Sequence, residues 1–163
     1  MTEATTQRLR IGRNFARDEI DGIAQQWEVG EFFIDERPLC EWLGIGRDLW
    51  QYGTDFDPNS PEPIRLRAVE AFLRRAEAHN QFGSGRLVLY RCHCGCDYCG
   101  VISCHLKVGD DHVIWQDVTF EDDVGPASGH NAPDSSLPAL TPVARFVFDR
   151  VQYEQELERY RAL

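Results

Sequence analysis

The chain has 163 residues, 42% of them apolar, and carries a formal net charge of −10 at pH 7. This apolar content excludes global disorder, and the length is that of a single domain, residues 1–163, with its own hydrophobic core. The negative charge repels phosphate backbones and argues against nucleic-acid binding as the main role.

The first half of the chain is predicted to contain strands followed by two helices. Residues 1–7 read as a frayed tail and residues 9–15 as a strand, while 26–34 fits either a strand pair or one bulged strand. A short helix is expected over 39–43. Apolar residues at four-residue spacing then predict an amphipathic helix over about 61–79.

The second half is predicted to begin with three strands. The apolar run 87–90 leads into a cysteine-rich turn, and residues 100–108 and 113–120 follow as further strands. Short turns between these segments favour a three-stranded antiparallel meander over 86–120. Residues 121–143 are rich in proline, glycine and serine, so we expect a mobile connection there.

The C-terminal segment is predicted to end in a helix. Phe146 and Phe148 suggest a short edge strand, and Asp149 is placed to cap a helix over 150–160. The buried side of that helix is predicted to contain Val151, Leu157 and Tyr160. Together these elements predict an α+β fold, in which two or three helices pack on one face of an antiparallel sheet.

The segment 92–104 holds five of the six cysteines of the chain. Zinc in structural sites takes four ligands in a tetrahedron, and the candidates in this turn are Cys92, Cys94, Cys96 and Cys99. A disulfide or redox pair, and reduced cysteines that bind nothing, are the alternatives. Cys104 lies farther along the returning strand and reads as a core residue, as does Cys40.

The segment 108–144 contains no lysine or arginine. Its acids form either a solvated loop and strand edge or a docking surface for a basic protein partner. Trp50, Tyr52 and Phe56, in an expected loop, read as exposed aromatic residues that could join such a surface. The acids proposed for partner contact are Asp110, Asp111, Asp117, Glu121, Asp122 and Asp123.

The N-terminus has no apolar signal-like region, and no segment has the roughly 18 consecutive apolar residues of a membrane span. We therefore expect a soluble, cytoplasmic protein that binds no membrane. Thiols stay reduced in that compartment, which favours a metal over structural disulfides in the cysteine turn.

Several segments resemble a family of small bacterial proteins of uncharacterised function. The resemblance rests on the CGxxxCG pattern in which Cys94 and Cys99 stand, on the Val-Ile-Trp element at 113–115, and on the stretches 33–39 and 148–154. It implies the same strand–turn–strand architecture and a shared role for Cys94 and Cys99. The family lends no established activity.

No catalytic motif appears, because the sequence contains no phosphate-binding loop, nucleophile elbow or zinc-hydrolase signature. The chain is therefore interpreted as an acidic, non-catalytic binding protein, such as an immunity protein or inhibitor that neutralises a toxin. The alternatives are a zinc-stabilised adaptor and a thiol-dependent oxidoreductase that uses Cys96 and Cys99.

Overall fold

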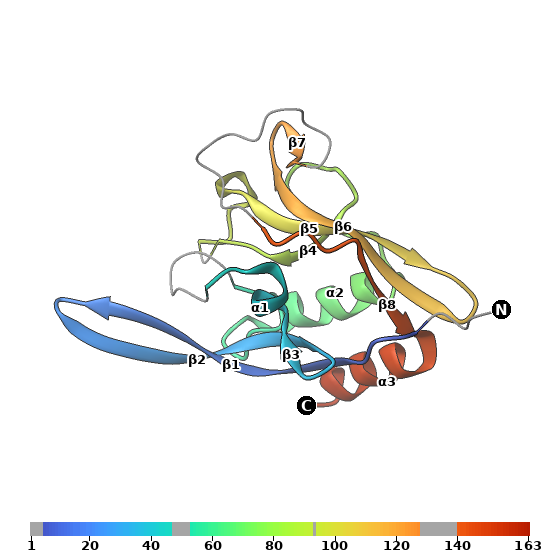
Figure 1. Cartoon of the computed structure of the whole chain (residues 1–163), viewed down its shortest axis with the longest axis horizontal. Helices are drawn as coiled ribbons and strands as arrows, with labels where there is room; N and C mark the ends of the chain where they lie inside the picture. The colour runs from blue at the N-terminus through green and yellow to red at the C-terminus, as the bar shows by residue number, and fades with distance from the viewer. Residues whose placement is uncertain (1–4, 47–52, 93, 128–139) are drawn as a thin grey trace.

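The computed structural model describes residues 5–46, 53–92, 94–127 and 140–163. Its architecture is two antiparallel sheets with three helices, so the predicted α+β fold is confirmed (Figure 1). The smaller sheet has the strand order β1 (Leu9–Ile20), β2 (Ile23–Ile34), β3 (Arg37–Pro38). The larger sheet contains β4 (Leu87–Tyr90), β5 (Val101–Val108), β6 (His112–Asp122), β7 (Gly125–Pro126) and β8 (Arg145–Asp149).

The larger sheet is built on the predicted meander, because β4, β5 and β6 are consecutive antiparallel neighbours. Strand β8 pairs with the other edge of β6, which makes it the expected edge strand. The three helices are α1 (Leu39–Leu43), α2 (Glu62–Phe72) and α3 (Arg150–Arg161). Within the described ranges, no helix is long and apolar enough to cross a membrane.

The β1–β2 hairpin is longer than the sequence analysis predicted, since each strand has 12 residues. The two strands meet at Asp21 and Gly22, whose φ angles of 52° and 77° are those of a tight two-residue hairpin turn. The far end projects from the body of the protein (Figure 1), and Ile23 there is 63% exposed. Segment 26–34 is therefore part of one long strand rather than a strand pair.

Helix α2 ends earlier than predicted. The apolar spacing continues to residue 79, but the helix stops at Phe72, and Arg74 adopts a φ of 57°. This left-handed residue turns the chain, and the amide groups of Arg75 and Ala76 bond to the Glu70 carbonyl instead of continuing the helix.

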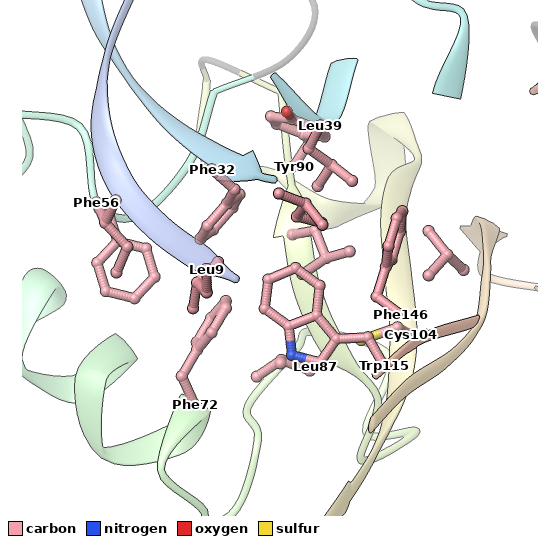
Figure 2. Close-up of a cluster of buried hydrophobic side chains, with 14 of the residues drawn as sticks. Leu9, Phe32, Leu39, Phe56, Phe72, Leu87, Tyr90, Cys104, Trp115 and Phe146 are labelled. Carbon is pink, nitrogen blue, oxygen red and sulfur yellow. The ribbon is translucent and has the colours of Figure 1, made fainter. Parts of the chain in front are cut away.

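An aromatic core joins the two sheets (Figure 2). The Phe32 ring of β2 packs edge-on against Trp115 of β6, with ring centroids 5.6 Å apart, and stacks on Phe72 of α2 at 5.5 Å. Phe56 also lies in this core with 2% exposure, so its prediction as an exposed aromatic residue is wrong. Burial of each such ring stabilises the fold by about 1.5–3 kcal/mol.

The C-terminal helix α3 begins where the sequence predicts. The Asp149 carboxylate accepts a hydrogen bond from the Gln152 amide at 3.0 Å, which confirms the cap. Leu157 is buried as predicted, but Val151 is 61% exposed. The buried position in this first turn belongs to Tyr153, and its hydroxyl donates to the Phe72 carbonyl at 2.9 Å.

The expected connection over 121–143 contains the end of β6 and the short strand β7. Strand β7 pairs with β6 through Gly125 and Pro126. Residues 128–139 of this segment lie outside the described residues. The prediction that this connection is mobile stays a prediction.

Candidate metal centre and adjoining pocket

The cysteine turn connects β4 to β5 at one end of the larger sheet. Its backbone contains two hydrogen bonds between residues three positions apart. One runs from the Gly95 amide to the Cys92 carbonyl at 3.0 Å, and the other from the Gly100 amide to the Asp97 carbonyl at 2.9 Å. Gly100 has a φ of 95°, and a Cβ atom there would lie 2.9 Å from the Phe120 ring. Glycine is therefore required at this position for both conformation and space.

Three thiols of the turn lie together. The Sγ atoms of Cys92, Cys94 and Cys99 are all within 4.8 Å of one another. Cys94 Sγ is 3.3 Å from Cys92 Sγ and 3.6 Å from Cys99 Sγ. A tetrahedral zinc ion with bonds of about 2.3 Å separates its sulfur ligands by about 3.8 Å, so small movements would bring these thiols into that geometry.

The environment of the thiols differs from one cysteine to the next. The pKa of the Cys94 thiol is lowered, chiefly because the Cys96 amide donates to its sulfur at 3.4 Å. The pKa of Cys99 is raised to about 12, chiefly by its hydrogen bond with Cys94. Cys94 and Cys99 are exposed and Cys92 is half-buried, so an ion could reach the group from solvent.

Three of the four predicted zinc ligands are thus brought together, and Cys96 is not among them. The Cys96 backbone amide, rather than its thiol, contacts the cluster, because the turn tightens into the short 3-10 helix η1 (Asp97–Cys99) directly after it. Within the described part of the chain, no histidine or carboxylate joins the group. His93 lies outside the described residues.

The other two cysteines are core residues, as predicted. Cys104 of β5 is fully buried, and burial raises the pKa of its thiol. Cys40 of α1 is 5% exposed and is 3.9 Å from the Asn14 side-chain amide. Neither cysteine is part of the thiol group.

A buried ionic network fixes the turn to the body of the protein. Asp97 has no exposed surface, and its carboxylate accepts from the Arg91 guanidinium at 2.8 Å and from the Gln81 amide at 2.8 Å. Arg91 also pairs with Asp55 at 3.1 Å. Burial raises the pKa of Asp55 despite the opposing effect of the Arg91 charge. Two carboxylates therefore share one guanidinium group at the base of the turn's connection to β4.

This network is not predictable from the sequence alone. Gly53 and Arg91 exchange backbone hydrogen bonds of 2.8 Å in each direction, which brings the segment of Asp55 beside the end of β4. The contact joins positions 38 residues apart, since one lies at 53 and the other at 91. The only local signal was the position of Arg91 and Asp97 on either side of the first cysteines.

A pocket of about 580 Å³ lies next to the thiol group, and Cys92 contributes to its wall. Its other walls come from the β1–β2 hairpin, the segment before α2, α2 itself and the cysteine turn. The volume is in the range of small-ligand sites. Residues with titratable side chains in its lining include Glu28, Asp55, Asp57, Arg67, His79, Arg91 and Asp97.

The structure does not gather the predicted partner-contact acids in one place. Asp110 and Asp111 are exposed in the turn before β6, whereas Asp122 and Asp123 lie at its opposite end. Eleven residues of extended strand separate the two pairs by roughly 35 Å. The acids therefore form two separate pairs rather than one continuous patch, and Asp122 is half-buried.

Two further acids of that prediction are not free surface charges. Glu121 is 1% exposed, because its position at the end of β6 points into the protein, and its carboxylate has no hydrogen-bond partner among the described residues. Asp117 is exposed but pairs with Arg86 at 3.1 Å. Trp50 and Tyr52, the aromatic residues of the same prediction, lie outside the described residues.

Comparison of the chain with family models, with curated proteins and with solved structures finds no significant match. The resemblance to small bacterial proteins with a CGxxxCG turn therefore stays a prediction.

Proposed function

We propose that the chain is a non-catalytic protein-binding protein whose cysteine turn holds one structural zinc ion. The observation that carries the metal proposal is the group of three thiols, Cys92, Cys94 and Cys99, within 4.8 Å of one another. Thiolates are strong zinc ligands, and three of them from one turn leave the fourth coordination position of a structural site to a further side chain.

A structural role is supported by the connections of the turn. The thiols follow directly on β4, and η1 and Gly100 lead into β5, so an ion bound to them would hold the ends of two strands of the sheet. Within the described residues, no carboxylate or imidazole lies in the thiol group to serve as a general base.

The metal proposal is tested by serine variants and metal stoichiometry. Cys94→Ser and Cys99→Ser should abolish stoichiometric binding of added Zn²⁺, because each removes one of three thiolates. Cys96→Ser is the matched control, since this cysteine belongs to the same turn but not to the group. Loss of zinc in Cys96→Ser, or its retention in Cys94→Ser, would contradict the assignment.

The binding proposal rests on charge. A chain with a net charge of −10 and exposed acids at both ends of β6 (Asp110, Asp111 and Asp123) attracts basic proteins and accelerates their encounter. The class of partner that fits is a basic protein, and an inhibitor or immunity protein that neutralises a basic toxin is the role we propose. A cytoplasmic location belongs to the same proposal.

The binding proposal is tested with the partner obtained by affinity purification. Its association rate should fall as salt rises, because exposed charges are screened within about 10 Å at 0.1 M salt. Asp122→Asn with Asp123→Asn should slow association further, and Asp110→Asn with Asp111→Asn tests the other end of β6. If the first double variant leaves both affinity and association rate unchanged, the proposed acidic contact is wrong.

The same sulfur distances favour thiol redox chemistry as a second candidate. Cys94 Sγ lies 3.3 Å from Cys92 Sγ and 3.6 Å from Cys99 Sγ, and a disulfide requires about 2.05 Å, so an oxidised pair would join Cys94 to Cys92 or Cys99 rather than Cys96 to Cys99. A peroxide would take two electrons and two protons from the pair and be reduced to water. Peptide mapping after peroxide treatment should find a disulfide that includes Cys94; exclusive formation of a Cys96–Cys99 disulfide would contradict the candidate.

A further inference from the structure

The pocket beside the cysteine turn has its own chemistry, separate from the thiol group. Its lining contains four carboxylates but only two guanidinium groups, those of Arg67 and Arg91. Arg91 is shared by Asp55 and Asp97, as described above. The pocket is therefore a negatively charged cavity of about 580 Å³ in an acidic protein.

The remaining acids of the pocket have weaker compensation. Glu28 pairs with Arg13 at 2.6 Å on the exposed side of the hairpin. The Asp57 carboxylate accepts from the backbone amides of Gly30 at 3.3 Å and Asn59 at 2.9 Å, but it has no ion pair among the described residues. Asp57 therefore contributes a negative charge to the pocket that no cationic side chain of the described residues neutralises.

An aromatic side chain completes the cavity. Trp27 of β2 is half-buried and lines the pocket, and it stands opposite Ala16 of β1 in the hairpin register. Within the described ranges, neither an aromatic ring nor a cation packs on its indole. Indole faces attract cations, and a planar guanidinium can also stack on them.

We propose that this pocket takes the guanidinium group of one arginine side chain of the basic partner. The Asp55 carboxylate supplies the charge, and the Trp27 indole supplies the apolar face. This inference rests on the proposed function, since it names the part of the partner that the site would recognise. A buried arginine flanked by aromatic and acidic groups is typical of the residues that dominate interface affinity.

The guanidinium group of Arg67 in the lining opposes the binding of a second cation. Arg67 of α2 is exposed, and its charge acts on Asp55. His79 is also exposed at the pocket. Because Arg67 has no ion pair among the described residues, removal of its charge should strengthen the binding of a cation without breaking a contact. An anionic ligand would respond in the opposite direction.

The test uses arginine capped at both ends, N-acetyl-arginine N-methylamide, titrated into the full chain and followed by the NMR signal of the Trp27 indole N–H. The wild-type protein should bind it saturably. Asp55→Asn should weaken binding about tenfold, because it removes a charge-assisted hydrogen bond. Trp27→Leu lacks the indole signal and is followed instead by the backbone amide signal of Gly53, which also lines the pocket; it should weaken binding less. Arg67→Gln should strengthen binding.

Glu19→Gln is the matched control, because this exposed acid lies outside the pocket and should leave binding unchanged. Asp55→Asn also removes an ion pair of Arg91 and could impair folding. If it does, binding of capped arginine to Arg67→Gln decides the test. Absence of saturable binding to the wild type, or weaker binding to Arg67→Gln, would overturn the inference.

The outcome is separable from that of the proposed function. If capped arginine fails to bind while the acidic pairs still control association with the partner, the pocket inference falls and the binding proposal stands. If capped arginine binds at Asp55 while no basic partner associates, the guanidinium site stands and its assignment to a partner protein falls.

Discussion

Asp97 is the residue whose replacement should most directly loosen the cysteine turn. Its carboxylate has no exposed surface, and it accepts hydrogen bonds of 2.8 Å from both the Arg91 guanidinium and the Gln81 backbone amide. Asp97→Ala removes both bonds. It leaves Arg91 with Asp55 as its ionic partner and leaves the Gln81 amide without its acceptor.

The expected cost follows from these contacts. A hydrogen bond to a charged group contributes about 1.5–3 kcal/mol net, and loss of one partner of a buried ion pair costs about 3–5 kcal/mol. In the variant, Arg91 keeps its ion pair with Asp55, and its side chain is 19% exposed. The expected loss in the free energy of unfolding is therefore at the lower end of that range, about 3 kcal/mol. For a chain of this length, that lowers Tm by about 6–12 °C.

Urea unfolding followed by tryptophan fluorescence measures this change in the free energy of unfolding. Asp123→Ala is the control, because its side chain is exposed, and it should change stability by less than about 0.5 kcal/mol. A loss of less than about 1 kcal/mol in Asp97→Ala would refute the account of a buried network that holds the turn.

Two further predictions concern the turn and the core. Gly100→Ala should destabilise the protein by about 2 kcal/mol, because the new Cβ atom would meet the Phe120 ring at a residue with positive φ. Gly83→Ala is the control, since Gly83 also has a positive φ but no atom lies within 4 Å of the added Cβ, and it should lower thermal stability less. An equal loss of stability in the two variants would contradict the packing argument. Tyr153→Phe should cost about 1–2 kcal/mol in urea unfolding, because Trp115 and Phe72 lose a buried partner. Val151→Ala should leave the free energy of unfolding nearly unchanged, because Val151 is exposed. A larger loss of stability in Val151→Ala than in Tyr153→Phe would instead support a helix that buries Val151.

Much of the fold could be predicted because its signals are local. The meander alternates between short turns and apolar runs, and Asp149 stands directly before its helix with a side chain that caps it. The Asp21–Gly22 turn is also a local signal, but it was missed because the strands around it are mostly exposed and lack a clear apolar alternation.

The site was harder to predict because its geometry depends on contacts distant in sequence. Spacing alone gives Cys96 and Cys99 as a C-x-x-C pair, whereas the 3-10 turn after Cys96 brings Cys94 to Cys99 instead. Nothing in the local sequence places Asp55 beside Arg91. The acids were grouped because they are close along the chain, but an extended strand carries its two ends far apart.

The most direct test of the account is native mass spectrometry of the purified chain, with and without a chelator. We predict a mass excess of one zinc ion in the wild type and in Cys96→Ser, and none in Cys94→Ser. Removal of zinc by the chelator should shift the protein to the higher charge states of an unfolded chain, because a structural ion contributes folding free energy. A metal-free wild type after incubation with Zn²⁺, or an unchanged charge distribution after zinc removal, would contradict a structural zinc site.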